Sequence, residues 1–167
     1  AWIQERWDRY LVALPFAKLN INIGNPVFIP RKSSTCSIVV SGVKKGENPL
    51  NTIMWTNLGY PTVGITVPLM VVNKENQPAY MVTAKDSQNA YMCDWNLERK
   101  HKIFPITRGN GNKYMNVNLI IEYMNQALAI ENKVFEMSEP IVEKINKGEG
   151  NYQDFKPVYD FIWEKIK

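Results

Sequence analysis

The chain has 167 residues, of which 45% are hydrophobic, 22% charged and 11% aromatic. This composition is typical of one globular domain and excludes a disordered, collagenous or coiled-coil chain, so we expect a single domain over 1–167. The net charge of +4 is mild and its basic residues are scattered, which argues against nucleic acid as a partner. No apolar run approaches the roughly 18 residues of a membrane span, and no signal-peptide pattern opens the sequence.

The first predicted element is an amphipathic helix over 2–14. Its apolar side chains recur at helical spacing and its charged residues fall elsewhere on the helical wheel. Pro15 should end this helix, because proline removes a backbone donor and restricts the residue before it. The prolines and the Gly-Asn pair within 16–32 predict an irregular connection.

Three β-branched runs follow, separated by two turns rich in glycine and proline. They cover 33–43, 52–58 and 62–72. Because the turns are short, we expect consecutive antiparallel strands of one sheet. Pro68 places the third strand at an edge or a bulge, since proline cannot donate to a ladder.

The middle of the chain carries a weak signal, and the rest is helical. Residues 79–83 fit a short strand or a helical turn, and 89–102 fit a helix. From Lys113 onward apolar residues recur at helical spacing, and this helix is expected to cover the sheet. We expect a kink or break at Pro140, with Ser138 capping a new turn.

A last helix should begin at Pro157, after the glycines at 148 and 150 end the previous one. The predicted order is therefore one helix, three strands, an ambiguous middle and further helices. This order indicates the α+β class, an antiparallel sheet with helices.

The sequence offers few groups for catalysis. Its single histidine, His101, lies in a basic stretch and is interpreted as a surface residue, although an acid–base or phosphate-binding role stays open. With one histidine, two cysteines distant from each other (Cys36 and Cys93) and no acidic cluster, no zinc site of ordinary spacing can form, so no metal and no cofactor are expected. Both cysteines are interpreted as small buried residues, because a nucleophilic thiol needs an adjacent base.

Three other residues are candidates for substrate binding: Arg31, Ser33 and Asn57. Small hydroxyl residues at the start of a buried strand leave the space that a ligand pocket requires, and Arg31 could grip a carboxylate there. A solvated arginine at the end of a strand is the structural alternative. Asn57 could donate to a developing oxyanion, or it could simply stabilise the glycine turn that follows it.

Several stretches of the strand region carry a resemblance to a known family. They read RKSSTCSIVVSGV at 31–43, GENP at 46–49, TIMWTNLG at 52–59 and VGITVP at 63–68. Together they resemble the C-terminal half of bacterial N-terminal-nucleophile amide hydrolases, of the isopenicillin N acyltransferase-like and choloylglycine-hydrolase-like family. The resemblance covers about residues 1–72, and the helical tail fits only by its position.

The resemblance implies a fold and a chemistry. The fold would be part of a four-layer αββα sandwich, and the reaction would be attack on a linear amide by an N-terminal cysteine whose own α-amino group is the base. This chain departs from that pattern, because residue 1 is alanine and neither cysteine is terminal. The nucleophile-bearing half would then come from another chain or a missing N-terminal segment, with Arg31, Ser33 and Asn57 beside the substrate. A non-catalytic α+β ligand-binding or interaction domain is the alternative.

The strand sequences also predict a partner. Ile38, Val39 and Val40 are consecutive β-branched residues, and 53–58 carries apolar residues on both faces of the pleat. Burial on both faces fits a sheet between two layers. We therefore expect the second face to be covered by another chain, a missing half or a symmetry mate, which makes an oligomer the expected state.

Overall fold

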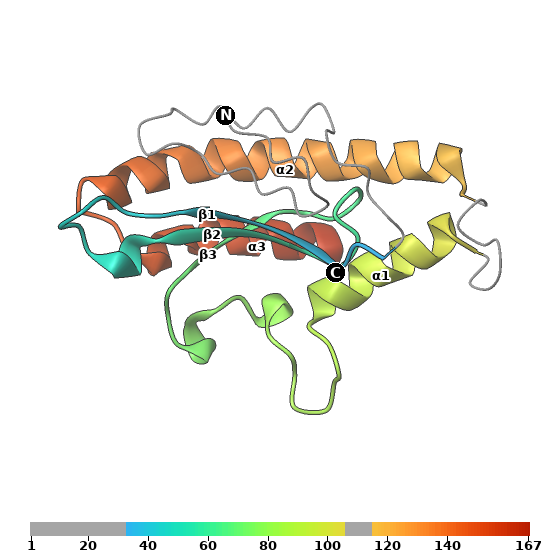
Figure 1. The fold of residues 1–167 in the computed structure, drawn as a ribbon, viewed down its shortest axis with the longest axis horizontal. Helices are drawn as coiled ribbons and strands as arrows, with labels where there is room; N and C mark the ends of the chain where they lie inside the picture. The colour runs from blue at the N-terminus through green and yellow to red at the C-terminus, as the bar shows by residue number, and fades with distance from the viewer. Residues whose placement is uncertain (1–32, 106–114) are drawn as a thin grey trace, which may run out of the picture.

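The structure is a computed structural model that describes residues 33–105 and 115–167. The helix predicted over 2–14 and the connection over 16–32 lie outside these residues. Figure 1 shows the arrangement of a mixed α+β fold, and the predicted class is confirmed. Its strands and helices are β1 (Cys36–Ser41), β2 (Ile53–Leu58), β3 (Val67–Met70), α1 (Tyr91–Ile103), α2 (Val117–Asn146) and α3 (Lys156–Ile166).

The sheet has the predicted topology. Its order is β1-β2-β3, and both pairs are antiparallel, with Val39 opposite Trp55 and Trp55 opposite Pro68. Pro68 therefore lies on an edge strand, as expected. β3 is shorter than the predicted run over 62–72, because the backbone at Gly64 packs against asparagine side chains and does not pair with a strand.

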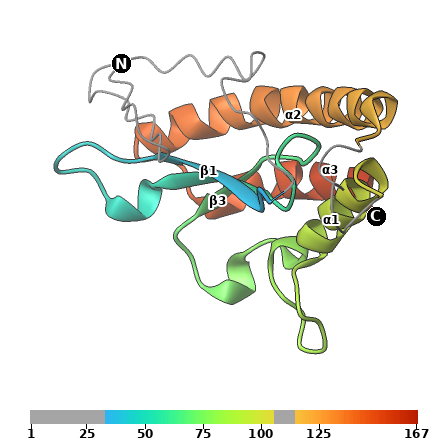
Figure 2. The same cartoon turned by 45° about the vertical axis from the view of Figure 1, so that its right-hand side comes forward.

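The main core lies on the β2–β3 side of the sheet. Ile53 and Val67, which point to opposite faces, are only 3% and 0% exposed. The same core contains residues of all three helices, and the ring centroids of Trp55 and Phe135 of α2 are 5.2 Å apart. The predicted cover of the sheet by the long C-terminal helix is thus confirmed. Figure 2 shows α2 and α3 beside the strands from a second direction.

Helix α2 is continuous through Pro140, so the predicted break and the predicted Ser138 cap are wrong. Pro140 is exposed, whereas Ser138 and Ile145 on either side of it are buried. Tertiary packing of this stripe compensates for the hydrogen bond that the proline cannot donate. The buried residues of α2 are Ala127, Glu131, Val134, Ser138 and Ile145.

The remaining elements agree with those predicted from the sequence. Residues Ala79–Met81 form a 3-10 turn, which resolves the choice between strand and helical turn, and α1 matches the helix predicted over 89–102. Gly148 has a φ of +77°, a conformation that favours glycine, and α2 ends just before it. None of the helices in the described residues is long and apolar enough to span a bilayer.

Candidate functional site

Of the three residues predicted to bind substrate, the structure describes Ser33 and Asn57. Arg31 lies outside the described residues. Ser33 is exposed ahead of β1, whereas Asn57 is buried on β2. Thr35 accepts a hydrogen bond from the Gly59 N–H at 2.7 Å. The segment that begins at Ser33 therefore runs beside the end of β2 that carries Asn57.

Asn57 is 5% exposed, and its amide is turned toward the chain itself. The Nδ2 group lies 3.4 Å from the Pro61 carbonyl oxygen, which is a long and weak hydrogen bond. Its Oδ1 atom is buried without a hydrogen-bond partner among the described residues. For Asn57 to donate to an oxyanion, Nδ2 would have to leave Pro61, and the length of that bond makes the exchange inexpensive.

A second asparagine, Asn96 of α1, completes a buried amide cluster with Asn57. Its Nδ2 donates to the Leu58 carbonyl at 2.6 Å, while its Oδ1 is buried without a partner in the described part of the chain. A Cβ placed on Gly64 would collide with Asn57 Oδ1 and Asn96 Nδ2. Glycine is therefore required between the two amides. The glycine within a β-branched run was the sequence signal for this approach, but nothing in the sequence pointed to Asn96.

Glu131 of α2 is a buried carboxyl that contacts the chain just after Gly64. It accepts a hydrogen bond from the Thr66 N–H at 2.8 Å and so ties α2 to the segment between β2 and β3. Burial raises the pKa of the Glu131 carboxyl, although the hydrogen bond from Thr66 opposes this shift. The site favours the neutral acid.

The cysteines do not form a catalytic pair with a base. Cys36 is free and exposed, so its predicted burial is wrong: β1 lies outside the core. Cys93 is free and only half-buried, and burial together with the charge of Asp94 raises the pKa of its thiol. His101 is exposed near the end of α1, as predicted for a surface residue. Across 33–105 and 115–167, no group of three His, Cys, Asp or Glu could hold a metal ion.

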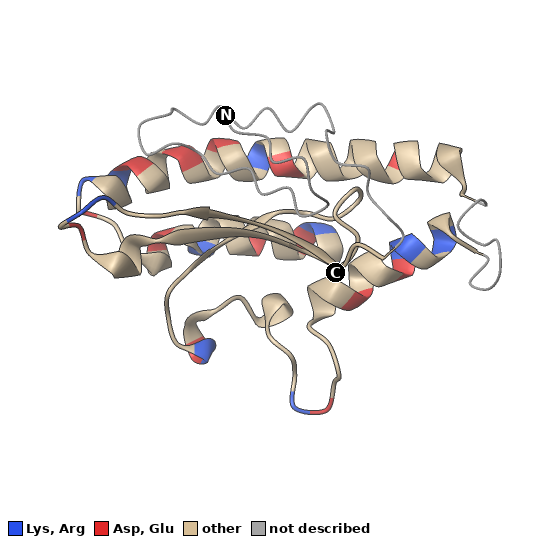
Figure 3. Ribbon diagram, in the orientation of Figure 1, with Lys and Arg blue, Asp and Glu red and all other residues tan. Residues whose placement is uncertain are grey.

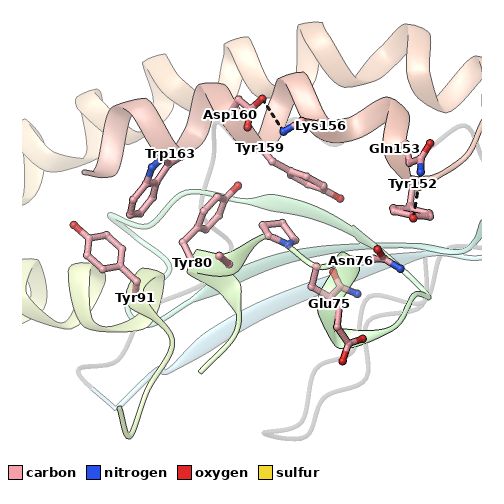
Figure 4. Close-up of a pocket in the computed structure, with 13 residues that line it drawn as sticks. Glu75, Asn76, Tyr80, Tyr91, Tyr152, Gln153, Lys156, Tyr159, Asp160 and Trp163 are labelled. Atoms are coloured by element: carbon pink, nitrogen blue, oxygen red, sulfur yellow. Dashed lines mark hydrogen bonds and ion pairs between the residues drawn. The ribbon is translucent and has the colours of Figure 1, made fainter. Parts of the chain in front are cut away.

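A cavity lies between α3 and the segment that joins β3 to α1, and its lining includes neither Asn57 nor Asn96 of the amide cluster. Its volume is about 670 Å³. Aromatic side chains form much of its wall, as Figure 4 shows. The wall includes Gln77, Tyr80, Tyr91, Tyr159, Asp160 and Trp163.

Two of these rings are held firmly by backbone carbonyls, and one is not. The Tyr91 hydroxyl donates to Ile166 and the Tyr159 hydroxyl donates to Pro68, each at 2.9 Å. Tyr80 is buried, yet its hydroxyl has no hydrogen-bond partner within the described residues. Burial, together with Tyr159 and Asp160, raises the pKa of Tyr80 well above its usual value, so the hydroxyl stays protonated.

Charges of both signs are interspersed on the helices, and the three strands carry none (Figure 3). The surface of the described residues therefore offers no broad single-sign field. Comparison of the chain with family models, with curated proteins and with solved structures gives no match.

Proposed function

We propose that this chain is one portion of a hydrolase or acyltransferase that acts on linear amide C–N bonds, with its nucleophile supplied by another segment or chain. The resemblance of the strand region to N-terminal-nucleophile hydrolases motivates the proposal. The observation that supports it best is the environment of β1. This strand carries part of the resemblance, and it needs a cover that the described residues do not provide.

The three central side chains of β1 are apolar but exposed. Ile38, Val39 and Val40 are 49%, 38% and 59% exposed, and they alternate between the two faces of the strand. The outer edge of β1 pairs with no other strand in the described residues. A four-layer sandwich would supply a second sheet and neighbouring strands at this place. An apolar, two-sided edge strand is otherwise a liability for a protein in water.

In the proposed reaction, the thiolate of a terminal cysteine attacks the amide carbonyl carbon, and its α-amino group accepts the thiol proton. The C–N bond breaks as the amine leaves with that proton, and water then hydrolyses the thioester. Arg31 would bind a substrate carboxylate, and Asn57 would stabilise the oxyanion beside Ser33. No cofactor or metal is required by this scheme.

Activity assays test the proposal directly. The 167-residue chain and the product of its full coding region are each assayed against penicillin V, bile-salt conjugates and N-acyl amino acids. We expect turnover only from the full product, lost when its N-terminal cysteine is replaced by alanine. Turnover by the 167-residue chain that disappears in Cys36→Ala would contradict the missing nucleophile. A full product inactive on all three amide classes would overturn the hydrolase proposal.

Association tests the cover of β1 separately. We expect light scattering of the chain at micromolar concentration to show an oligomer or a complex with its other half. Val40→Glu should break that association, whereas Val71→Glu should not, because Val71 is similarly exposed but lies beyond β3. A stable monomer whose β1 amides exchange as freely as solvated ones would contradict the proposed sandwich.

The alternative, a non-catalytic ligand-binding domain, is favoured by a different observation. The cavity beside α3 has an unpaired buried hydroxyl on its wall, and a ligand can satisfy such a group. This alternative is tested by ligand binding without turnover, as described next.

A further inference from the structure

We propose that the cavity between α3 and the β3–α1 connection binds a small organic cation, an amine or guanidinium carried on an apolar or aromatic body. The proposal is independent of the amide hydrolase reaction, since the cavity is built from other residues. Three features of the cavity wall support the proposal: the aromatic faces, the unpaired polar atoms and the balance of charge.

The aromatic faces are arranged at different angles around the cavity. Tyr80 and Trp163 are parallel within 2° at a centroid distance of 6.0 Å, and Tyr91 meets Trp163 at 71° and 5.2 Å. Trp163 is nevertheless partly exposed, so part of its ring remains accessible to a ligand. The negative faces of Trp and Tyr rings attract cations, and rings set at an angle to one another can contact one cation from two sides.

Two buried polar atoms on the wall lack partners within the described residues: the Tyr80 hydroxyl and the Oε1 atom of Gln77. Gln77 is fixed, because its Nε2 donates to the Met70 carbonyl at 2.9 Å. The oxygen left over can only accept a hydrogen bond. In Figure 4 the Tyr80 hydroxyl points toward α3, between Trp163 and Tyr159. Gln77 Oε1 therefore requires an N–H or O–H donor from a ligand, whereas the Tyr80 hydroxyl can donate or accept.

The charge around the cavity favours a cation among such donors. Glu75, Asp160 and Lys156 line it, which leaves an excess of one negative charge. Lys156 and Asp160 form an ion pair of 3.4 Å with both side chains exposed. Exposed pairs of this kind contribute little, so Asp160 can exchange its partner for a ligand ammonium at small cost. A carboxylate ligand would instead meet Glu75 and Asp160 and leave Gln77 Oε1 unsatisfied.

A matched series of ligands tests the chemistry. Phenethylamine, 2-phenylethanol and 3-phenylpropionate share one ring and differ in charge, and glucose serves as a neutral polyol. Binding to the 167-residue chain is followed by 19F NMR of 5-fluorotryptophan, with the Trp163 resonance assigned through Trp163→Phe. We expect phenethylamine to shift that resonance with at least fivefold higher affinity than the alcohol, and no shift with the carboxylate.

Two tyrosine variants separate binding from folding. Tyr80→Phe removes the unpaired hydroxyl, so we expect about a tenfold loss of affinity with the melting temperature unchanged or raised. Tyr159→Phe removes the hydrogen bond to Pro68, so it should lower the melting temperature by a few degrees, which Tyr80→Phe should not. Asp160→Asn should weaken phenethylamine binding about fivefold and leave the alcohol unaffected.

Several outcomes would overturn the proposal. These are equal binding of the three phenyl ligands, a preference for glucose, no shift of Trp163 with any ligand, or unchanged affinity in Tyr80→Phe. The last result is decisive even if Tyr159→Phe proves too unstable to measure, because Tyr80→Phe removes no hydrogen bond of the fold.

Discussion

Strands β1 and β3 flank the same central strand, and both are apolar, yet their environments are opposite. Val67 and Leu69 of β3 are buried, whereas Ile38 and Val40 of β1 are exposed. The difference arises because the helical core packs over β2 and β3, while β1 is attached mainly by its backbone ladder to β2. An apolar strand is therefore not by itself a core strand. Its burial depends on which neighbours reach it.

The largest expected effect contrasts two isoleucines of adjacent strands. Ile53→Ala should reduce the free energy of unfolding by about 3 kcal/mol, because it leaves a cavity in a closed core. Ile38→Ala should change it by less than about 0.5 kcal/mol in the chain alone, since this side chain is half exposed. Urea denaturation measures both. Equal losses in the two variants would show that β1 is buried in solution.

A pair of glycines gives the next contrast. Gly64→Ala should destabilise the chain by about 2 kcal/mol, because the new methyl group would collide with Asn57 and Asn96 in a packed region. Gly42→Ala, next to β1, should be nearly neutral, since an added Cβ there contacts nothing within 4 Å. If Gly64→Ala were tolerated, the close approach of the two amides would be wrong.

Glu131, which lies in the buried part of the molecule, predicts that the free energy of unfolding depends on pH. Its pKa is raised in the folded chain, so the folded state holds the proton more tightly than the unfolded state. The stability that this group contributes is full below its unfolded pKa and is lost as pH rises through the folded pKa. Glu131→Gln keeps an acceptor for Thr66, so it should remove this loss and raise stability at pH 7 relative to the wild-type chain.

Urea denaturation of the wild-type chain and Glu131→Gln between pH 4 and pH 8 measures this effect. Glu136→Gln, an exposed carboxyl on the same helix, is the control and should follow the wild-type curve. Parallel curves for all three proteins would show that Glu131 is not the titrating group.

The smallest expected effect lies on the attachment of β1. The Trp55 Nε1 group donates to Ser41 Oγ at 3.2 Å in an exposed position. Ser41→Ala should cost less than about 0.5 kcal/mol, because water can replace the hydroxyl. Thermal melts with a Trp55→Phe background test whether the two changes are coupled. A loss above 2 kcal/mol in Ser41→Ala would mean that this contact is shielded from water.

The sheet topology could be predicted because it depends on local signals. Glycines and prolines that favour turns follow β1 and β2, and Pro68 identifies an edge. The length of β3 could not be predicted from the sequence. The loop at Gly64 is shaped by Asn96, which comes from a helix far along the chain. The exposure of Cys36 was also missed. Strand periodicity does not reveal which strands the helices cover.

The predicted and observed sites differ for a similar reason. Asn57 stood out because it precedes a glycine turn, and its location in a buried cluster leaves the predicted oxyanion role untested. The cavity beside α3 was not predicted at all. It joins Tyr80, from a segment with a weak local signal, to Trp163 near the C-terminus. Only tertiary folding brings these two rings together.

The unpaired edge of β1 also bears on solubility. Within the described residues, the outer edge of β1 pairs with no strand, and such an edge with three adjacent β-branched side chains is a template for intermolecular cross-β pairing. Lys44 and Lys45 follow this strand after Gly42 and Val43, and both are exposed, in the position of charged gatekeepers that oppose such growth. Repulsion between the same lysines of neighbouring copies disfavours the stacking of identical chains in register. A different partner with an acidic flank would not be repelled in this way. The same two charges thus separate self-aggregation from assembly with a distinct chain.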